Sequence, residues 1–97
     1  MLVFSWDRRK AQTNVRKHGV PFVEAATVFG DPLSLTVADP MSPDDEPRFV
    51  ILGRSAVGRF LVVIHAARGD SIRIISARPA TRRERRDHEE TKTGSSR

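Results

Sequence analysis

The 97-residue sequence contains no cysteine and no tyrosine, and only one tryptophan. Without cysteine the chain has no disulfide, no Cys-ligated zinc site and no thiol nucleophile, which fits a reducing cytosol. So few large aromatic rings leave few platforms on which nucleic-acid bases could stack. The longest apolar run, residues 60–64, has only the length of a strand. We therefore expect no signal peptide and no membrane span, and we predict a cytoplasmic protein.

Acidic residues are scarce in one half of the chain. The formal net charge is +5. Residues 1–58 carry seven Lys or Arg and seven Asp or Glu, whereas residues 59–97 carry ten and five. An excess confined to one half favours a polyanion or an acidic protein as partner. A basic surface that serves solubility alone is the alternative.

The N-terminal third predicts a strand and two helices. Residues 2–6 have the pattern of a short strand, and Asp7 is suited to cap a helix over residues 8–18 that ends at Gly19. Three basic residues in the first turn oppose the helix dipole, which indicates that they serve something outside the helix. A second helix begins at Pro21, with an apolar stripe at helical spacing formed by Phe22, Ala25, Ala26 and Phe29.

The remaining sequence predicts an antiparallel sheet and a last helix. Alternating residues 33–37 form a strand, and an acidic, proline-rich loop follows at residues 39–47. Short turns then separate three strands at residues 48–54, 59–67 and 70–78, which favours a meander. A charged helix over residues 80–90 and a disordered tail over residues 91–97 end the chain. The fold class is therefore α+β, with one domain over residues 1–90.

The sequence resembles the BrnT family of toxins. The resemblance lies in SWDRRKAQTNVRKHGVPFVEAATVF, in the Asp-Pro-Leu-Ser-Leu-Thr segment, in the acidic loop leading into RFVILG, and in RGDSIRIISARPATRRER. Pro79 departs from it, because a basic residue is common there. The resemblance implies a RelE-like fold, endoribonuclease activity without a cofactor, and neutralisation by a BrnA-like antitoxin with a ribbon-helix-helix portion. A toxin–antitoxin heterotetramer is the assembly that it leaves open.

The predicted turns set a strand register. If residues 68–69 form a two-residue turn, Arg59 faces Arg78 and His65 faces Ile72. If residues 55–58 form a four-residue turn, Arg54 faces Arg59 and Arg48 faces His65. One face then gathers Arg48, Arg54, Arg59, Arg78 and His65. Opposed like charges are destabilising, so these arginines need an anion. That anion is either a carboxylate or a phosphate, which the planar guanidinium binds well.

Metal-independent RNA cleavage needs a base, an acid and a cation beside the phosphate. His65 is the candidate titrating group, and Arg48, Arg59 and Arg78 are the candidate catalytic cations. A lone strand histidine is more often structural, and orientation of the RNA by basic residues alone is the alternative. His18 is a second candidate, although its place beside Gly19 is equally that of a helix cap. His88 is expected to lie on a solvated helix and is set aside.

The other charged residues are assigned to binding. Lys17, Arg54, Arg82 and Arg83 are the candidate RNA-binding residues, although the last helix could equally dock an acidic antitoxin helix. The acidic loop with Asp39, Asp44, Asp45 and Glu46 could hold a divalent cation. Its spacing matches no known cation loop, so we predict no metal site and expect the loop to be solvated or to neutralise arginines. A non-catalytic nucleic-acid-binding module and a purely structural partner protein are the rival functions.

Overall fold

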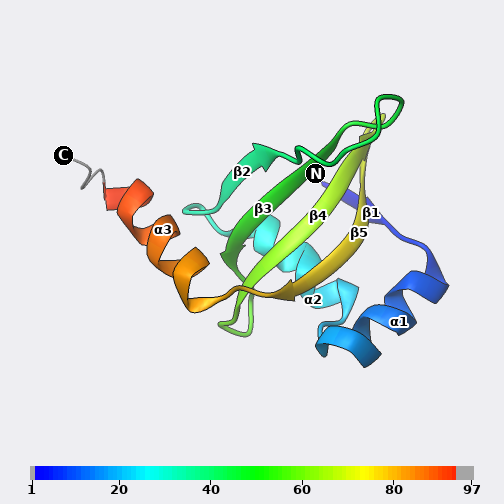
Figure 1. Ribbon diagram of the computed structural model, residues 1–97. Coiled ribbons are helices and arrows are strands. Elements are labelled where there is room, and N and C mark those ends of the chain that lie inside the picture. The colour runs from blue at the N-terminus through cyan, green and yellow to red at the C-terminus, as the bar shows by residue number, and fades with distance from the viewer. Residues whose placement is uncertain (1, 94–97) are drawn as a thin grey trace.

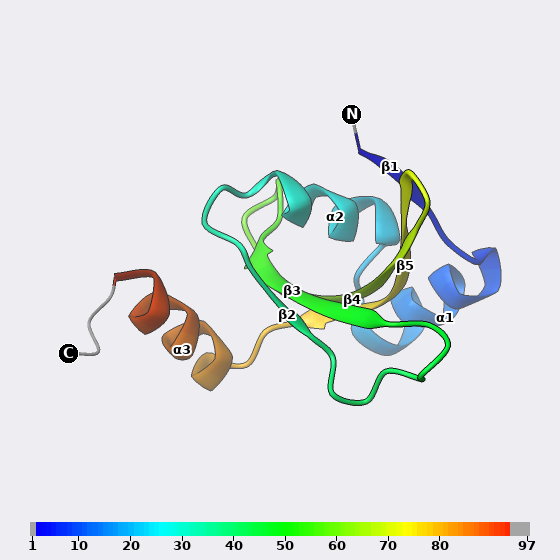
Figure 2. The ribbon, with the colours of Figure 1, turned by 90° about the horizontal axis from the view of Figure 1, so that it is seen from above.

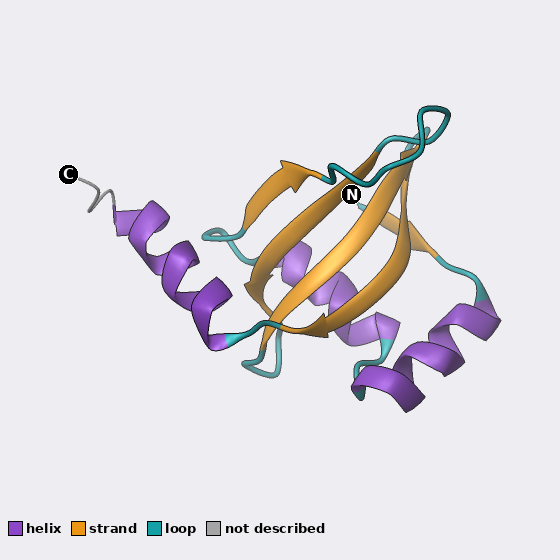
Figure 3. Ribbon diagram, in the orientation of Figure 1, coloured by secondary structure: helices purple, strands orange, loops and turns teal. Residues whose placement is uncertain are grey.

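The computed structural model describes residues 2–93. A curved five-stranded sheet with strand order β1-β5-β4-β3-β2 forms its centre, and helices flank it (Figures 1 and 3). The elements along the chain are β1 (Val3–Ser5), α1 (Arg8–His18), α2 (Phe22–Thr27), the 3-10 turn η1 (Val28–Gly30), β2 (Leu35–Ala38), β3 (Arg48–Arg54), β4 (Phe60–Arg68), β5 (Ser71–Pro79) and α3 (Arg82–Thr93). No helix of this described chain is long and apolar enough to cross a membrane.

The two faces of the sheet differ in what covers them. Helix α2 lies in the concave side of the sheet, and α3 lies on the opposite side (Figure 2). On the α2 side, here called the inner face, the core contains Phe22, Val28, Ile51, Leu61 and Val63. The opposite, outer face carries Arg48, Val50, Leu52 and Arg54 of β3, because side chains alternate along a strand. The predicted stripe of the second helix is thus the part that covers the core.

The predicted α+β class is confirmed, and α3 extends to Thr93, beyond the predicted residue 90. Residues 94–97 of the predicted tail lie outside the described residues. The sheet was expected to be antiparallel throughout, and here the prediction was wrong for one strand. β1 pairs with β5 in parallel, with Val3 opposite Ser71 and Ser5 opposite Arg73. Nothing local in residues 2–6 indicates a partner that far along the chain.

The predicted registers were also wrong. The β4–β5 turn is Gly69-Asp70, one residue later than expected, so that Arg68 lies opposite Ser71. Further along, Ile64 pairs with Ser76 while His65 pairs with Ile74, so Ile75 has no partner and forms a β-bulge. In the other hairpin, five loop residues separate Arg54 from its partner Phe60, where four were expected.

Candidate functional site

Helix α1 displays basic residues that its own sequence does not neutralise. The Asp7 carboxylate accepts the Lys10 N–H at 3.0 Å and starts the helix, and Gly19 at φ 69° ends it by donating to the Val15 carbonyl. Between these caps lie Arg8, Arg9, Lys10, Arg16 and Lys17, without one acidic residue. Among the described residues, no ion pair involves any of these five side chains. Only the Asp7 carboxylate at its N-terminus, which interacts electrostatically with Arg9 and Lys10, offsets part of this positive charge among the described residues.

A buried asparagine fixes α1 against the sheet. Asn14 is 5 % exposed. Its Nδ2 donates to the Ala77 carbonyl at 2.8 Å and to the Val20 carbonyl at 2.9 Å, and its Oδ1 accepts the Ala77 N–H at 3.1 Å. β1 ends its pairing with β5 at Arg73, so the Asn14 amide satisfies the β5 edge beyond that point, as another strand would. The basic helix is thereby locked at a fixed distance from β5.

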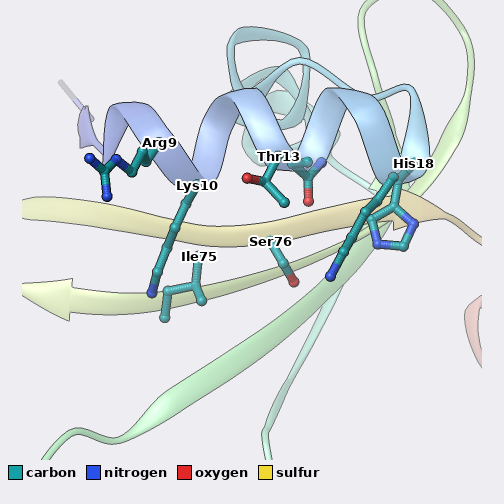
Figure 4. A pocket seen from close by; sticks show the side chains of 8 residues that line it. Arg9, Lys10, Thr13, His18, Ile75 and Ser76 are labelled. Carbon is teal, nitrogen blue, oxygen red and sulfur yellow. The ribbon is translucent and has the colours of Figure 1, made fainter.

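A cavity lies between α1 and β5. This α1–β5 groove has a volume of about 390 Å³ and is lined by Arg9, Lys10, Thr13, Asn14, Lys17, His18, Ile75 and Ser76. Lys10 extends across β5 and ends beside Ile75, and Ser76 points to the same side (Figure 4). No carboxylate of residues 2–93 lines the groove, whereas three cations, two hydroxyls and an imidazole do. Such a lining is suited to an anionic ligand such as a phosphodiester.

The predicted site residues are divided between the two faces. Arg48 pairs with Ala66, Arg54 with Phe60 and Arg78 with Val62, which puts all three on the outer face. His65 pairs with Phe49 and lies on the inner face. Arg59 has the same parity as His65 and reaches towards α2. The expected row of Arg54, Arg59 and Arg78 therefore does not form. The five-residue loop before Phe60 shifts the β3–β4 register by one residue from the predicted one. The bulge at Ile75 moves the side chains of Ser76 and Arg78 to the face opposite to the predicted one.

Arg59 connects the β3–β4 loop with Glu24 of α2 and with Gly19 at the end of α1. Its Nε and Nη2 donate to the Glu24 carboxylate at 2.9 and 2.6 Å, and Nη2 also donates to the Gly19 carbonyl. Ser55 donates to the same carboxylate at 2.7 Å. The Arg59 hydrogen bonds and then that of Ser55 hold the pKa of Glu24 below its ordinary value. These contacts give Arg59 a structural role, because they hold the β3–β4 loop against α2.

His65 is packed as a core aromatic side chain. It is 7 % exposed, and the rings of Phe29 and Phe49 lie with their centroids 4.7 and 5.9 Å from the imidazole. Its Nδ1 is buried without a hydrogen-bond partner among the described residues. Burial lowers the pKa of His65, which favours the neutral ring. In this packing the imidazole is enclosed by the aromatic side chains of the inner face.

Arg78 holds α3 against the outer face. Its guanidinium makes a bidentate pair with Glu84 at 2.9 and 2.7 Å, and this pair, with the Thr81 N–H, lowers the Glu84 pKa to about 2. His88 is buried at 3 % exposure, with Nε2 2.7 Å from the Leu33 carbonyl oxygen and its ring against Phe60. The expectation of a solvated His88 was wrong, because the helix turns this residue towards β2 and β4.

The remaining predicted RNA-binding residues are accessible. Lys17 lines the α1–β5 groove, and Arg82 and Arg83 are exposed on α3. The guanidinium of Arg54 lies 4.5 Å from the centre of the Phe60 ring. Within the described residues, no group of three His, Cys, Asp or Glu side chains could hold a metal ion. The acidic loop instead directs Glu46 at arginines, as the neutralising alternative expected.

Sequence reasoning did not identify the contribution of β5 to the groove or two further arginines. The argument from the helix dipole singled out Arg9 and Lys10 in the first turn of α1. It did not indicate that these residues face β5. Ser76 could not be placed, because the bulge beside it has no sequence signal. Arg68 and Arg73, with Arg48, converge on Glu46 at 3.0, 3.1 and 3.4 Å. Their only signal was the acidic loop itself.

Comparison with known proteins identifies relatives with the same architecture. The sequence model of the BrnT family, described as ribonuclease toxin of type II toxin–antitoxin systems, matches residues 6–84. A crystal structure of the Brucella abortus ribonuclease toxin BrnT aligns with a TM-score of 0.61 at 26 % identity, over 84 % of this chain and 99 % of that one. No curated protein matches the chain. The family match contains every residue that lines the groove.

Proposed function

This chain belongs to the BrnT family of ribonuclease toxins of type II toxin–antitoxin systems, and from that premise we propose that it cleaves RNA in the α1–β5 groove by metal-independent transesterification. The observation that carries the proposal is the groove itself. It brings Lys10, Lys17 and His18 together, and no carboxylate in the described part of the chain lines it. A polyanion is the substrate class that such a surface attracts, and it needs no bound metal ion to do so.

The groove residues supply the groups that the reaction requires. Lys10 and Lys17 would stabilise the charge that develops on the phosphorus-centred transition state. His18 is exposed at the end of α1 and lines the same cavity, so it is the proposed proton acceptor or donor for the 2′-hydroxyl or the leaving 5′-oxygen. Ser76 and Thr13 supply hydroxyls that can position the phosphate. In this proposal His18, and not the enclosed His65, is the candidate acid or base.

The outer-face arginines would extend RNA binding beyond the groove. Arg78 is 41 % exposed at its side chain although it pairs with Glu84, and Arg48 is 29 % exposed. With Arg54, Arg82 and Arg83 they provide cations that contact the RNA backbone without reading its sequence. A RelE-like mode of action, in which basic residues orient the RNA, is compatible with this arrangement.

We test the proposal with labelled RNA, purified protein and chelator. The expected result is shorter fragments with chelator present, and little cleavage by the His18→Gln variant near neutral pH, because a positioned acid or base contributes about 100-fold or more. His65→Gln is the matched control and should still cleave RNA. Its melting temperature is measured in parallel to check that the variant is folded. Intact RNA that only shifts in mobility would favour the rival, a non-catalytic binding module.

The toxin role has its own test. Expression of the chain alone in bacteria should arrest growth, and co-expression of a BrnA-type ribbon-helix-helix antitoxin should restore it and yield a toxin–antitoxin complex, in our proposal a heterotetramer in the cytoplasm. The His18→Gln variant should accumulate as folded protein without the arrest. Normal growth with soluble wild-type protein would contradict the proposal.

A further inference from the structure

Three arginines from different strands share one carboxylate at the far end of the sheet. Arg48 begins β3, Arg68 ends β4 and Arg73 lies on β5, and each donates to Glu46. The Glu46 Oε2 accepts from Arg68 at 3.0 Å and from Arg73 at 3.1 Å, while Oε1 lies 3.4 Å from Arg48. We call this group the Glu46 arginine cluster. Three cations around a single anion leave positive charge in excess.

The cluster opens onto a cavity of about 600 Å³. Pro43, Asp45, Pro47 and Ala67 complete its lining. Asp45 makes no ion pair with the three arginines among the described residues, and including it with Glu46 still leaves one excess cation. The Arg48 Nε is a further donor in this group, buried and without an acceptor in the described part of the chain. The hydrogen-bond donors of the three arginines therefore exceed the acceptors that the described residues supply.

Glu46 sits on a loop with little other attachment to β4 and β5. The other hydrogen bonds of residues 39–47 remain within the loop or reach Arg48: Met41 donates to Asp39, Ser42 donates to Asp39, and Glu46 donates to Pro43. In the described part of the chain, only the Glu46 carboxylate bonds this loop to Arg68 and Arg73. Withdrawal of one side chain would therefore free all three guanidinium groups without disturbing the core.

We propose that the Glu46 arginine cluster is a second binding site for an RNA backbone phosphate, and that Glu46 occupies it as an internal substitute until the RNA displaces it. This inference rests on the function proposed above, since it assumes an RNA ligand. A phosphate offers oxygens to the same guanidinium forks that now hold the carboxylate. Arg73 and Ser76 lie on the same face of β5, roughly 10 Å apart at the rise of a strand. One RNA strand that runs along β5 would reach both sites.

The hydrogen bonds of Arg68, followed by those of Arg48, hold the pKa of Glu46 below its ordinary value. Glu46 therefore remains charged at neutral pH and competes as a full anion. Glu46 therefore sets the affinity that an anion needs to bind the arginines, because weak or isolated anions do not replace a carboxylate that is already bound. A long RNA that is also held in the α1–β5 groove can replace it.

The experiment compares Glu46→Gln with Asp45→Asn, which removes the same charge from the same cavity without touching the arginines. The ligand is a short 2′-O-methyl RNA, which lacks the nucleophile and cannot be cleaved. Glu46→Gln should bind it about fivefold more tightly at low salt. Its log–log salt dependence should be steeper by about 0.7 for each additional phosphate that the variant binds. Adding Arg68→Ala to Glu46→Gln should return the affinity to the wild-type value.

Each outcome decides between the two proposals. Equal tightening by Asp45→Asn means general electrostatics and overturns the cluster as a site, as does unchanged affinity of Glu46→Gln. If Glu46→Gln is unchanged while Lys17→Ala loses RNA, the groove stands and only this inference fails. If neither the wild type nor Glu46→Gln binds the RNA, both proposals fail. Thermal melts of every variant confirm that the compared proteins are folded.

Discussion

Helices α1 and α3 each carry five Lys or Arg residues, and neither has an ordinary apolar stripe. α1 has no acidic residue among its eleven, so it contributes a charge of +5. α3 has Glu84, Asp87, Glu89 and Glu90 among its twelve, so it contributes +1. The same number of cations therefore produces a strongly basic surface in one helix and a nearly balanced one in the other. The distribution of carboxylates, more than the number of Lys and Arg residues, therefore sets the net charge of each helix.

The two helices are also anchored differently. Neutral Asn14 holds α1 by its amide, which leaves the helix cations free to face the groove. α3 is held by the charged pair of Arg78 with Glu84 and by His88 against Leu33. The anchor of α3 thus uses one of the cations of the outer face, whereas the anchor of α1 uses none. This difference can be tested by changing each helix in turn.

The largest effect is expected from the cations themselves. Lys10→Ala with Lys17→Ala should slow RNA cleavage about 100- to 1000-fold, because in the proposed mechanism these side chains stabilise the developing charge. Arg82→Ala with Arg83→Ala removes the same charge from α3 and should reduce the rate only a few-fold, through weaker RNA binding. Cleavage rates at fixed salt give the comparison. Equal losses in the two double variants would remove the distinction between the helices.

The next effect concerns the anchor of α1. Asn14→Ala leaves the buried N–H and carbonyl of Ala77 without partners, and each such group costs about 1–3 kcal/mol of the free energy of unfolding. Urea unfolding measures it. Gln12→Ala, at an exposed position of the same helix, should change the free energy by less than about 0.5 kcal/mol. If the two variants unfold alike, Asn14 does not hold the helix.

A smaller, pH-dependent effect is expected for α3. The pKa of Glu84 is lowered from 4.5 to about 2, so its stabilising contribution is complete above pH 4.5 and is lost as the pH falls through about 2. At neutral pH, Glu84→Gln should cost about 1 kcal/mol, since the pair is partly exposed. That corresponds to roughly 4–8 °C in melting temperature.

Melting temperature as a function of pH measures this contribution. The difference between wild type and Glu84→Gln should shrink towards pH 2. Glu89→Gln, on the exposed surface of the same helix, should show no such trend. A constant difference across the acid range would mean that the ionised carboxylate of Glu84 does not supply this stability.

The smallest effect tests the contact of α3 with Phe60 of β4. The Arg85 guanidinium lies 5.1 Å from the centre of the Phe60 ring. Arg85→Ala should lower the free energy of unfolding by about 0.5 kcal/mol, and Arg83→Ala, which makes no such contact among the described residues, should leave it unchanged. Chemical unfolding of the two variants in parallel measures the difference in their free energies of unfolding. A larger loss for Arg83→Ala would place the contact surface on another side of the helix.

Sequence reasoning succeeded where structure is decided locally. The Asp7 cap, the Gly19 end of α1 and the core stripe of Phe22 and Ala25 follow from chemistry within a few residues of each position. The strand over residues 48–54 was also visible from the sequence. The candidate site depended on register, and register depends on turn lengths that differ by one residue. The bulge at Ile75 has no local signature, so Arg78 and Ser76 could not be assigned to the correct face.

The parallel pairing of β1 with β5 has a consequence for synthesis. The Asn14 bonds to Ala77 span 63 residues, and the groove combines α1 with Ile75 and Ser76. At about 5–20 residues per second, the ribosome makes α1 several seconds before its counterpart exists. A fragment released before β5 is made lacks the strand that lines one side of the groove and pairs with β1. The proposed site can therefore form only after β5 has been synthesised.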